Sequence, residues 1–111
     1  MNETDLTRLK DMLDAVNKVL EFASERSRAD VYRDDMLAFA LVHAVQIIGE
    51  AARLVSASTQ DQFAEIPWTE IIGMRHKLVH DYFSIDRDIV WDVVEMDLPP
   101  LKQKLEAILN S

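Results

Sequence analysis

Apolar residues recur three and four residues apart along the first part of the chain, which is the spacing of an amphipathic helix. The residues of this stripe are Leu6, Leu9, Leu13, Val16, Leu20 and Ala23. Charged side chains fall mostly between them, and Asn2 or Thr4 can cap the start of the helix. The pattern predicts one helix of a bundle, and the polar residues 24–30 predict a connection after it.

A second helix is predicted from about Arg33 to about Ser56, and it is apolar on nearly every side. Such a helix must be buried on most of its sides, and a bundle of this size covers only part of it. The surplus indicates a subunit interface, for which a two-fold homodimer is the commonest form. Gly49 would allow a close helix approach. The other interpretation is that this is the central helix of a monomer.

The next part of the chain alternates between polar breaks and shorter apolar segments. Residues 57–66 predict a loop, and Pro67 suits the first turn of a third helix. The helical pattern breaks again over residues 81–86, and a fourth helix follows. Asp86 or Ser84 can cap that fourth helix, because short polar side chains accept hydrogen bonds from the first free amides of a helix.

Pro99 and Pro100 are expected to interrupt the fourth helix, because proline disfavours the helical conformation in the residue before it. Apolar residues at helical spacing then continue to Leu109 as a short final helix. The sum is an all-α fold. It is predicted to be an antiparallel four-helix bundle with a broken or short fifth C-terminal helix, formed as a single domain over residues 1–111.

Composition supports a folded protein and bounds its chemistry. Hydrophobic residues make up 49% of the chain and charged residues 29%, which is typical of a soluble fold. The lack of cysteine excludes a disulfide framework and cysteine-ligated metal sites, and it suits a reducing cytoplasm. No signal peptide is evident, and the longest apolar run, 36–48, is shorter than the roughly 20 residues of a membrane span. We predict a cytoplasmic protein without membrane contact.

The net charge of −8 bears on possible partners. Contacts with phosphates dominate the affinity for nucleic acids, so this charge argues against a general DNA- or RNA-binding module. A small nuclease could still bind its substrate at one basic cleft. The charge therefore directs attention to places where positive groups gather locally.

Residues 75–82 gather groups that bind phosphate and move protons. They include Arg75, His76, Lys77, His80 and Tyr82. Arginine binds phosphate through a fixed fork of donors and stays charged, and histidine exchanges protons near pH 7. No acid lies between residues 71 and 80, so the segment is a local basic patch in an acidic chain.

The spacing within this patch constrains its use. His76 and His80 are four residues apart, like a two-histidine metal pair on one helix face. Lys77 lies where a zinc-protease motif has glutamate, and a cation beside a metal ion is unfavourable. We therefore predict no metal site and no cofactor. Arg75 and His80 lie about 140° apart around an ideal helix. Either the helix ends near Val79, or the site is completed across a dimer.

These residues also have purely structural interpretations. Arg75 could form a salt bridge with an acid such as Glu50 on the second helix. His80 could interact favourably with the dipole at a helix C-terminus, and Tyr82 could pack at the end of the bundle. The residue types and their spacing leave the functional and the structural interpretation open.

The arrangement Arg-x4-His-x-Tyr over residues 75–82 resembles the active-site motif of HEPN-type ribonuclease toxins, in particular their HepT branch. The similarity covers most of the chain. It includes the segments 48–52, 66–68, 71–75 and 97–101. The resemblance implies a single HEPN-like helical domain that forms a homodimer and acts as the toxin of a type VII-like toxin–antitoxin system.

The activity that the resemblance implies is metal-independent cleavage of RNA at a cleft formed by two subunits. Arg75 and His80 would be the catalytic residues: arginine holds the phosphate and histidine moves protons. His76 and Lys77 would support phosphate binding by their positive potential. We also expect Glu50 to orient the side chain of Arg75 without itself binding the substrate.

The partner implied by the resemblance is a minimal nucleotidyltransferase that acts as the antitoxin. It would transfer AMP onto Tyr82 and so place a bulky anion beside the basic patch. A second hypothesis is that the chain is a non-catalytic helical partner, or substrate-binding subunit, of such a nucleotidyltransferase. RNA cleavage by the unmodified protein distinguishes the two hypotheses.

Overall fold

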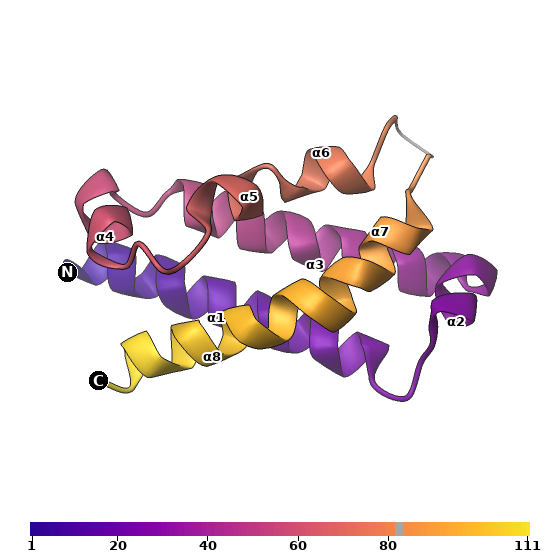
Figure 1. Cartoon of the computed structure of the whole chain (residues 1–111), viewed down its shortest axis with the longest axis horizontal. Helices are drawn as coiled ribbons and strands as arrows, with labels where there is room; N and C mark the ends of the chain where they lie inside the picture. The colour runs from indigo at the N-terminus through magenta and orange to yellow at the C-terminus, as the bar shows by residue number, and fades with distance from the viewer. Residues whose placement is uncertain (82–83) are drawn as a thin grey trace.

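Two long antiparallel helices, α1 (Glu3–Ala23) and α3 (Asp35–Arg53), lie side by side through the length of the molecule (Figure 1). The computed structural model describes residues 1–81 and 84–111. Over these two ranges it contains helices, turns and one isolated β-bridge, and no β-strand. The prediction of an all-α fold is therefore confirmed.

The first helix forms as its apolar spacing predicts. Asn2 caps it, because the side-chain oxygen of Asn2 accepts a hydrogen bond of 2.7 Å from the amide of Asp5. Its buried face carries Leu9, Met12, Val16 and Val19, all fully enclosed. That face packs against α3 and the C-terminal helix, so α1 forms one wall of the core.

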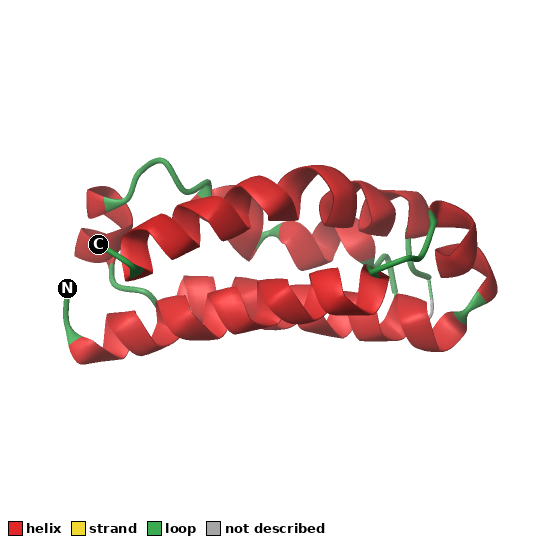
Figure 2. Cartoon of the chain, turned by 90° about the horizontal axis from the view of Figure 1, so that it is seen from below, coloured by secondary structure: helices red, strands yellow, loops and turns green. Residues whose placement is uncertain are grey.

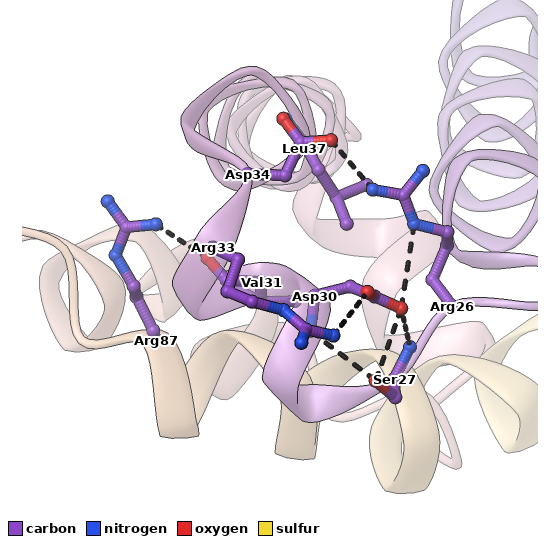
Figure 3. A network of polar contacts seen from close by, with 8 residues as sticks. All are labelled: Arg26, Ser27, Asp30, Val31, Arg33, Asp34, Leu37 and Arg87. Atoms are coloured by element: carbon purple, nitrogen blue, oxygen red, sulfur yellow. Dashed lines mark hydrogen bonds and ion pairs between the residues drawn. The ribbon is translucent and has the colours of Figure 1, made fainter.

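The predicted helix 33–56 corresponds to α3, whereas the predicted connection over residues 24–30 was wrong at its end, where α2 (Arg28–Arg33) begins. Ser27 and Asp30 form a reciprocal capping box that starts α2 (Figure 3). The backbone is extended at Asp34, and the carboxylate of Asp34 then caps α3 through the amide of Leu37 at 3.1 Å. The side-chain cap at Ser27 thus begins a helix in a stretch whose polar residues predicted a connection.

Helix α3 is the central element of the core. It packs against α1, α2, α5, α6 and α7, and residues such as Leu41 and Ile48 are completely buried. By length and hydropathy alone α3 could cross a membrane, but the core helices of soluble proteins also meet this criterion. In this fold 44% of the most apolar 18-residue stretch of α3 is buried inside the chain. Its remaining exposed surface is described with the site below.

The predicted loop 57–66 was wrong in part, since a short helix, α4 (Ala57–Gln62), occupies most of it. Asp5 on α1 anchors this helix. The buried Asp5 carboxylate accepts hydrogen bonds from the amide and hydroxyl of Ser56, at 3.0 and 2.5 Å, and from the hydroxyl of Thr59 at 2.6 Å. These bonds, led by the one from the Ser56 hydroxyl, hold the pKa of Asp5 below its ordinary value.

The predicted third helix consists of α5 (Trp68–Ile72) and α6 (Met74–Leu78), which meet at Gly73 and run along α3 (Figure 1). Beyond Leu78 the chain becomes extended, and Val79 pairs with Ile85 in the isolated bridge. This bridge lies toward the end of the molecule opposite both chain termini (Figure 1).

The last helical rod is continuous where an interruption was predicted. It comprises α7 (Arg87–Asp92), the π-helical segment η1 (Val93–Asp97) and α8 (Leu98–Leu109) (Figure 2). Asp86 caps α7 through the amide of Ile89 at 3.1 Å, as predicted. Pro99 and Pro100 do not break the rod, because the wider turn of η1 precedes them and they lie in the first turn of α8, where a missing amide is tolerated.

Candidate active site

Arg75 differs from the other arginines of the chain in its lack of a carboxylate partner. The sequence contains seven arginines. Six form ion pairs: Arg8, Arg26, Arg28, Arg33, Arg53 and Arg87. Figure 3 shows the polar network that holds three of them. Within residues 1–81 and 84–111, the exposed guanidinium of Arg75 has no ion pair or hydrogen bond, so its donors are available to an external anion.

Two hollows lie on either side of Arg75 against α3. The first has a volume of about 190 Å³ and is lined by Phe39, Val42, His43, Gln46, Arg75, Val79 and Ile85. The second has a volume of about 210 Å³ and is lined by Val45, Gln46, Gly49, Glu50, Ile72, Arg75 and His76. Arg75 and Gln46 line both hollows, so the two hollows are neighbours at the α3–α6 junction.

His80 lies beyond the end of α6, which ends at Leu78. The first of the two alternatives from the sequence is therefore the one observed: the helix ends before Val79, and the separation of about 140° on an ideal helix does not apply. The residue that caps the C-terminus of α6 is Val79 and not His80. Its imidazole is 63% exposed, and its Nε2 lies 3.8 Å from a carboxylate oxygen of Asp86.

The backbone around His80 is fixed from both sides. The amide of His80 donates to the carbonyl of Ser84 at 2.9 Å, and the amide of Asp86 donates to the carbonyl of Leu78 at 2.8 Å. The side chain of Asp81 accepts from the amide of Ser84 at 2.9 Å. These bonds fix the backbone at His80, whose imidazole is exposed. Tyr82 lies outside the described residues.

Glu50 forms its ion pair with Arg53, at 3.0 Å, and not with Arg75. The salt bridge that would have given Arg75 a purely structural role is thus absent within the described parts of the chain. Glu50 does line the second hollow together with Arg75 and His76. Its predicted role in orienting Arg75 stays a prediction.

The two supporting residues on α6 are exposed but face different surroundings. His76 lines the second hollow beside Arg75. Lys77 instead lines a groove of about 540 Å³ between α5–α6 and the C-terminal rod, so it does not border the hollows around Arg75. His76 and His80 do not share a helix, because His80 follows the end of α6. No group of three or more histidine or acidic side chains with metal-site geometry occurs in the described residues.

Sequence reasoning missed the contribution of α3 to this region. His43 and Gln46 lie within the apolar run 36–48 and were not among the predicted site residues, yet both line the first hollow beside Arg75. The available signal was their spacing of three residues, which puts two polar side chains on one face of an otherwise apolar helix.

An exposed apolar surface of α3 borders the same region. It carries Met36, Phe39, Ile47 and Leu54, exposed by 84, 47, 41 and 45%, and we call it the α3 face. These positions share one side of the helix. The apolar surplus predicted from the sequence is therefore present on the surface of the single chain, and it reaches the first hollow beside Arg75 through Phe39.

Comparison with known proteins connects this geometry to a family. The family model described as Ribonuclease HepT-like matches residues 12–108. A protein of Thermococcus cleftensis named as a probable ribonuclease HepT is 37% identical over 100 residues, covering 90% of this chain and 91% of its own. A Methanocaldococcus jannaschii protein named as a candidate RNase is 34% identical over 100 residues, covering 90% and 92%. No solved structure matches the chain significantly.

Proposed function

Because the chain belongs to the HepT-like ribonuclease family, we propose that it is an endoribonuclease that cleaves RNA without a metal ion, with Arg75 and His80 as its catalytic residues. The observation that carries the proposal is the guanidinium of Arg75, which has no carboxylate partner among the described residues of a chain with net charge −8. An exposed histidine held near the end of the same short helix supplies the proton chemistry.

The reaction is an attack by the ribose 2′-oxygen on the adjacent phosphorus. An imidazole takes the proton of the 2′-hydroxyl as the new P–O bond forms, and the bond from phosphorus to the 5′-oxygen breaks. A second proton donor protonates the departing 5′-oxygen. Arg75 binds the non-bridging oxygens through its fork and stabilises the negative charge that grows on them.

A homodimer supplies both the base and the acid from one residue type. The α3 face supports this part of the proposal, since exposed large apolar side chains gathered on one side of a helix are typical of an interface. Two copies related by a two-fold axis would bring both His80 side chains to one cleft. Each subunit would contribute the four-helix arrangement of α1, α3, α5–α6 and the C-terminal rod.

The biological role proposed is that of a cytoplasmic toxin, with a minimal nucleotidyltransferase as its antitoxin partner. Tyr82 follows His80 by two residues, so AMP transferred to Tyr82 would place a phosphate on the same short segment that carries Arg75 and His80. That bound anion would compete with the substrate phosphate for the guanidinium and block access to the cleft. Neutralisation would thus use the same charge that cleavage needs.

The test uses the purified chain made without any nucleotidyltransferase, with its intact mass recorded to establish that Tyr82 is unmodified. RNA is incubated with this protein in EDTA, and cleavage is followed on a gel. We expect cleavage by the wild type and a loss of about a hundredfold or more in Arg75→Ala and His80→Ala. Arg33→Ala is the matched control, because Arg33 is exposed, pairs with Asp30 and lines neither hollow beside Arg75.

The outcomes separate the hypotheses. If well-folded, unmodified wild type cleaves no RNA but binds a nucleotidyltransferase, the chain is the non-catalytic partner. Full activity in both Arg75→Ala and His80→Ala shows that the catalytic residues were assigned wrongly. Cleavage that EDTA abolishes contradicts a metal-independent reaction and directs attention back to the histidines as metal ligands.

A further inference from the structure

The first hollow beside Arg75 combines an apolar wall with a polar amide. Val42, Val79 and Ile85 form the partly buried wall, and Phe39, a residue that is 47% exposed, also lines the hollow. Gln46 projects from α3 into the same hollow and is itself partly buried. Its side-chain amide has no hydrogen-bond partner in residues 1–81 and 84–111.

The amide of Gln46 is not enclosed by the protein, so a ligand in the hollow can reach it. The amide of Gln46 offers both a donor and an acceptor from one planar group. Such a group matches the edge of a nucleobase, which presents donors and acceptors side by side. An exposed aromatic ring such as that of Phe39 is the usual partner for the face of an unstacked base.

We propose that this hollow receives one base of single-stranded RNA, next to the phosphate bound by Arg75, and that Gln46 selects which base enters. The inference rests on the proposed RNA cleavage and adds the origin of its base preference. The volume of about 190 Å³ lies below the roughly 300–1,000 Å³ of pockets that enclose whole small ligands. It suits one base whose sugar and phosphate remain outside, toward the guanidinium.

The arrangement of the elements supports this assignment. Phe39, His43 and Gln46 are spaced four and three residues apart, so one side of α3 presents the ring, the imidazole and the amide together. Val79 forms part of the opposite wall and directly precedes His80. A base in the hollow therefore lies between the helix that would read it and the segment that carries the proposed proton-transfer group.

The rival occupant is a side chain of a second copy, because Phe39 also belongs to the α3 face. A protein side chain would fill the apolar part of the hollow, and Gln46 would then affect association rather than base choice. Base preference and oligomeric state are separate measurements, so the two occupants make different predictions for the same substitution.

The substitution Gln46→Glu keeps the shape of the side chain and replaces its donor with an acceptor. The unmodified variant and wild type are each incubated with a pool of random-sequence RNA, and the cleaved ends are sequenced. We expect the base preference at one position beside the cleaved bond to change by about tenfold. Gln103→Glu on α8 is the matched control, because it makes the same chemical change at an exposed position outside the hollow.

A binding measurement covers the case in which Gln46→Glu stops cleavage. Short 2′-O-methyl oligonucleotides of A, C, G or U lack the attacking hydroxyl, so their affinities report recognition alone. We expect the order of the four affinities to differ between Gln46→Glu and wild type and to be unchanged in Gln103→Glu. Thermal unfolding of each variant establishes that the fold is intact.

Three results would overturn the inference. Cleavage with an unchanged base preference and unchanged order of affinities removes the subsite while leaving the proposed ribonuclease intact. A change in oligomeric state by light scattering, without a change in base preference, assigns the hollow to a second copy. A wild type that neither cleaves RNA nor distinguishes the four oligonucleotides refutes the proposed function and the subsite together.

Discussion

Replacing Gly49 with alanine tests how closely α3 packs against the segment that carries Arg75. Gly49 is buried in α3 and faces α5. An added Cβ would lie 3.1 Å from the carbonyl oxygen of Ile71, 3.5 Å from that of Ile72 and 3.9 Å from the Cα of Ile72. Because all three atoms belong to the backbone, no side-chain rotation relieves the contact, and α5 must move away by a few tenths of an ångström.

Two opposing effects set the size of the change. Alanine is favoured over glycine within a helix by about 1 kcal/mol. Overpacking of a closely packed contact costs about 1–3 kcal/mol. The backbone carbonyl at 3.1 Å makes the second effect the larger one, so we expect Gly49→Ala to be less stable than wild type by about 1 kcal/mol. For a domain of this length that lowers Tm by about 4 °C.

Urea and thermal unfolding measure the difference, and Ala40→Gly on the more open side of α3 calibrates the propensity effect in the same helix. Gly49→Ala should also reduce RNA cleavage, because Gly49 and Arg75 line the same hollow and a shift of α5 carries α6 with it. A Gly49→Ala protein about 1 kcal/mol more stable than wild type would refute the reasoning, since only the propensity gain would then operate.

Two further predictions concern Asp5 and the guanidinium of Arg75. Asp5→Asn should lower stability at pH 7, with a deficit that shrinks toward pH 3, because the wild-type contribution is present above the unfolded-state pKa and is lost as pH falls through the lowered folded-state pKa. Equal deficits in urea unfolding at both pH values would contradict this. Arg75→Lys should cleave RNA about a hundredfold more slowly, because lysine keeps the charge but loses the fork. Wild-type rates in that variant would show that a point charge suffices.

The long helices could be predicted from the sequence because their apolar spacing is sustained over many residues. The short helices α2 and α4 could not, since their residues are mostly polar and side-chain caps begin them. Ser27 with Asp30 starts one, and Ser56, anchored by the distant Asp5, starts the other. A contact between residues 51 positions apart leaves no periodic signal in the chain.

The continuity of the C-terminal rod could not be predicted for a different reason. Proline residues in a helical pattern normally mark an interruption. Here the amide of Leu98 bonds to the carbonyl of Val93, which widens the turn just before Pro99. The π-helical segment allows the rod to continue although Pro99 and Pro100 lack amide protons. Nothing in the spacing of apolar residues distinguishes this segment from an ordinary helical turn.

For the site, the sequence identified Arg75 and His80 by type and by family resemblance but could not say what surrounds them. Its own geometry raised an objection, because two residues five apart on a straight helix point apart. Because α6 ends at Leu78, the geometry of a straight helix does not apply to His80, although His80 lines neither of the hollows beside Arg75. The α3 side of the site, with His43 and Gln46, needed the packing of α6 against α3 before it could be recognised.

The distribution of ion pairs reconciles an acidic chain with an RNA substrate. Net charge −8 repels a polyanion at a distance, so affinity must come from a few specific contacts. The other arginines are held by carboxylates, as in the pairs of Arg28 with Asp88 and Asp92. Because each of these positive charges is offset by a nearby carboxylate, these arginines attract RNA only weakly. Among the arginines of the described residues, Arg75 is the one without such a partner, and a base subsite beside it would let a weakly attracting surface still choose where to cut.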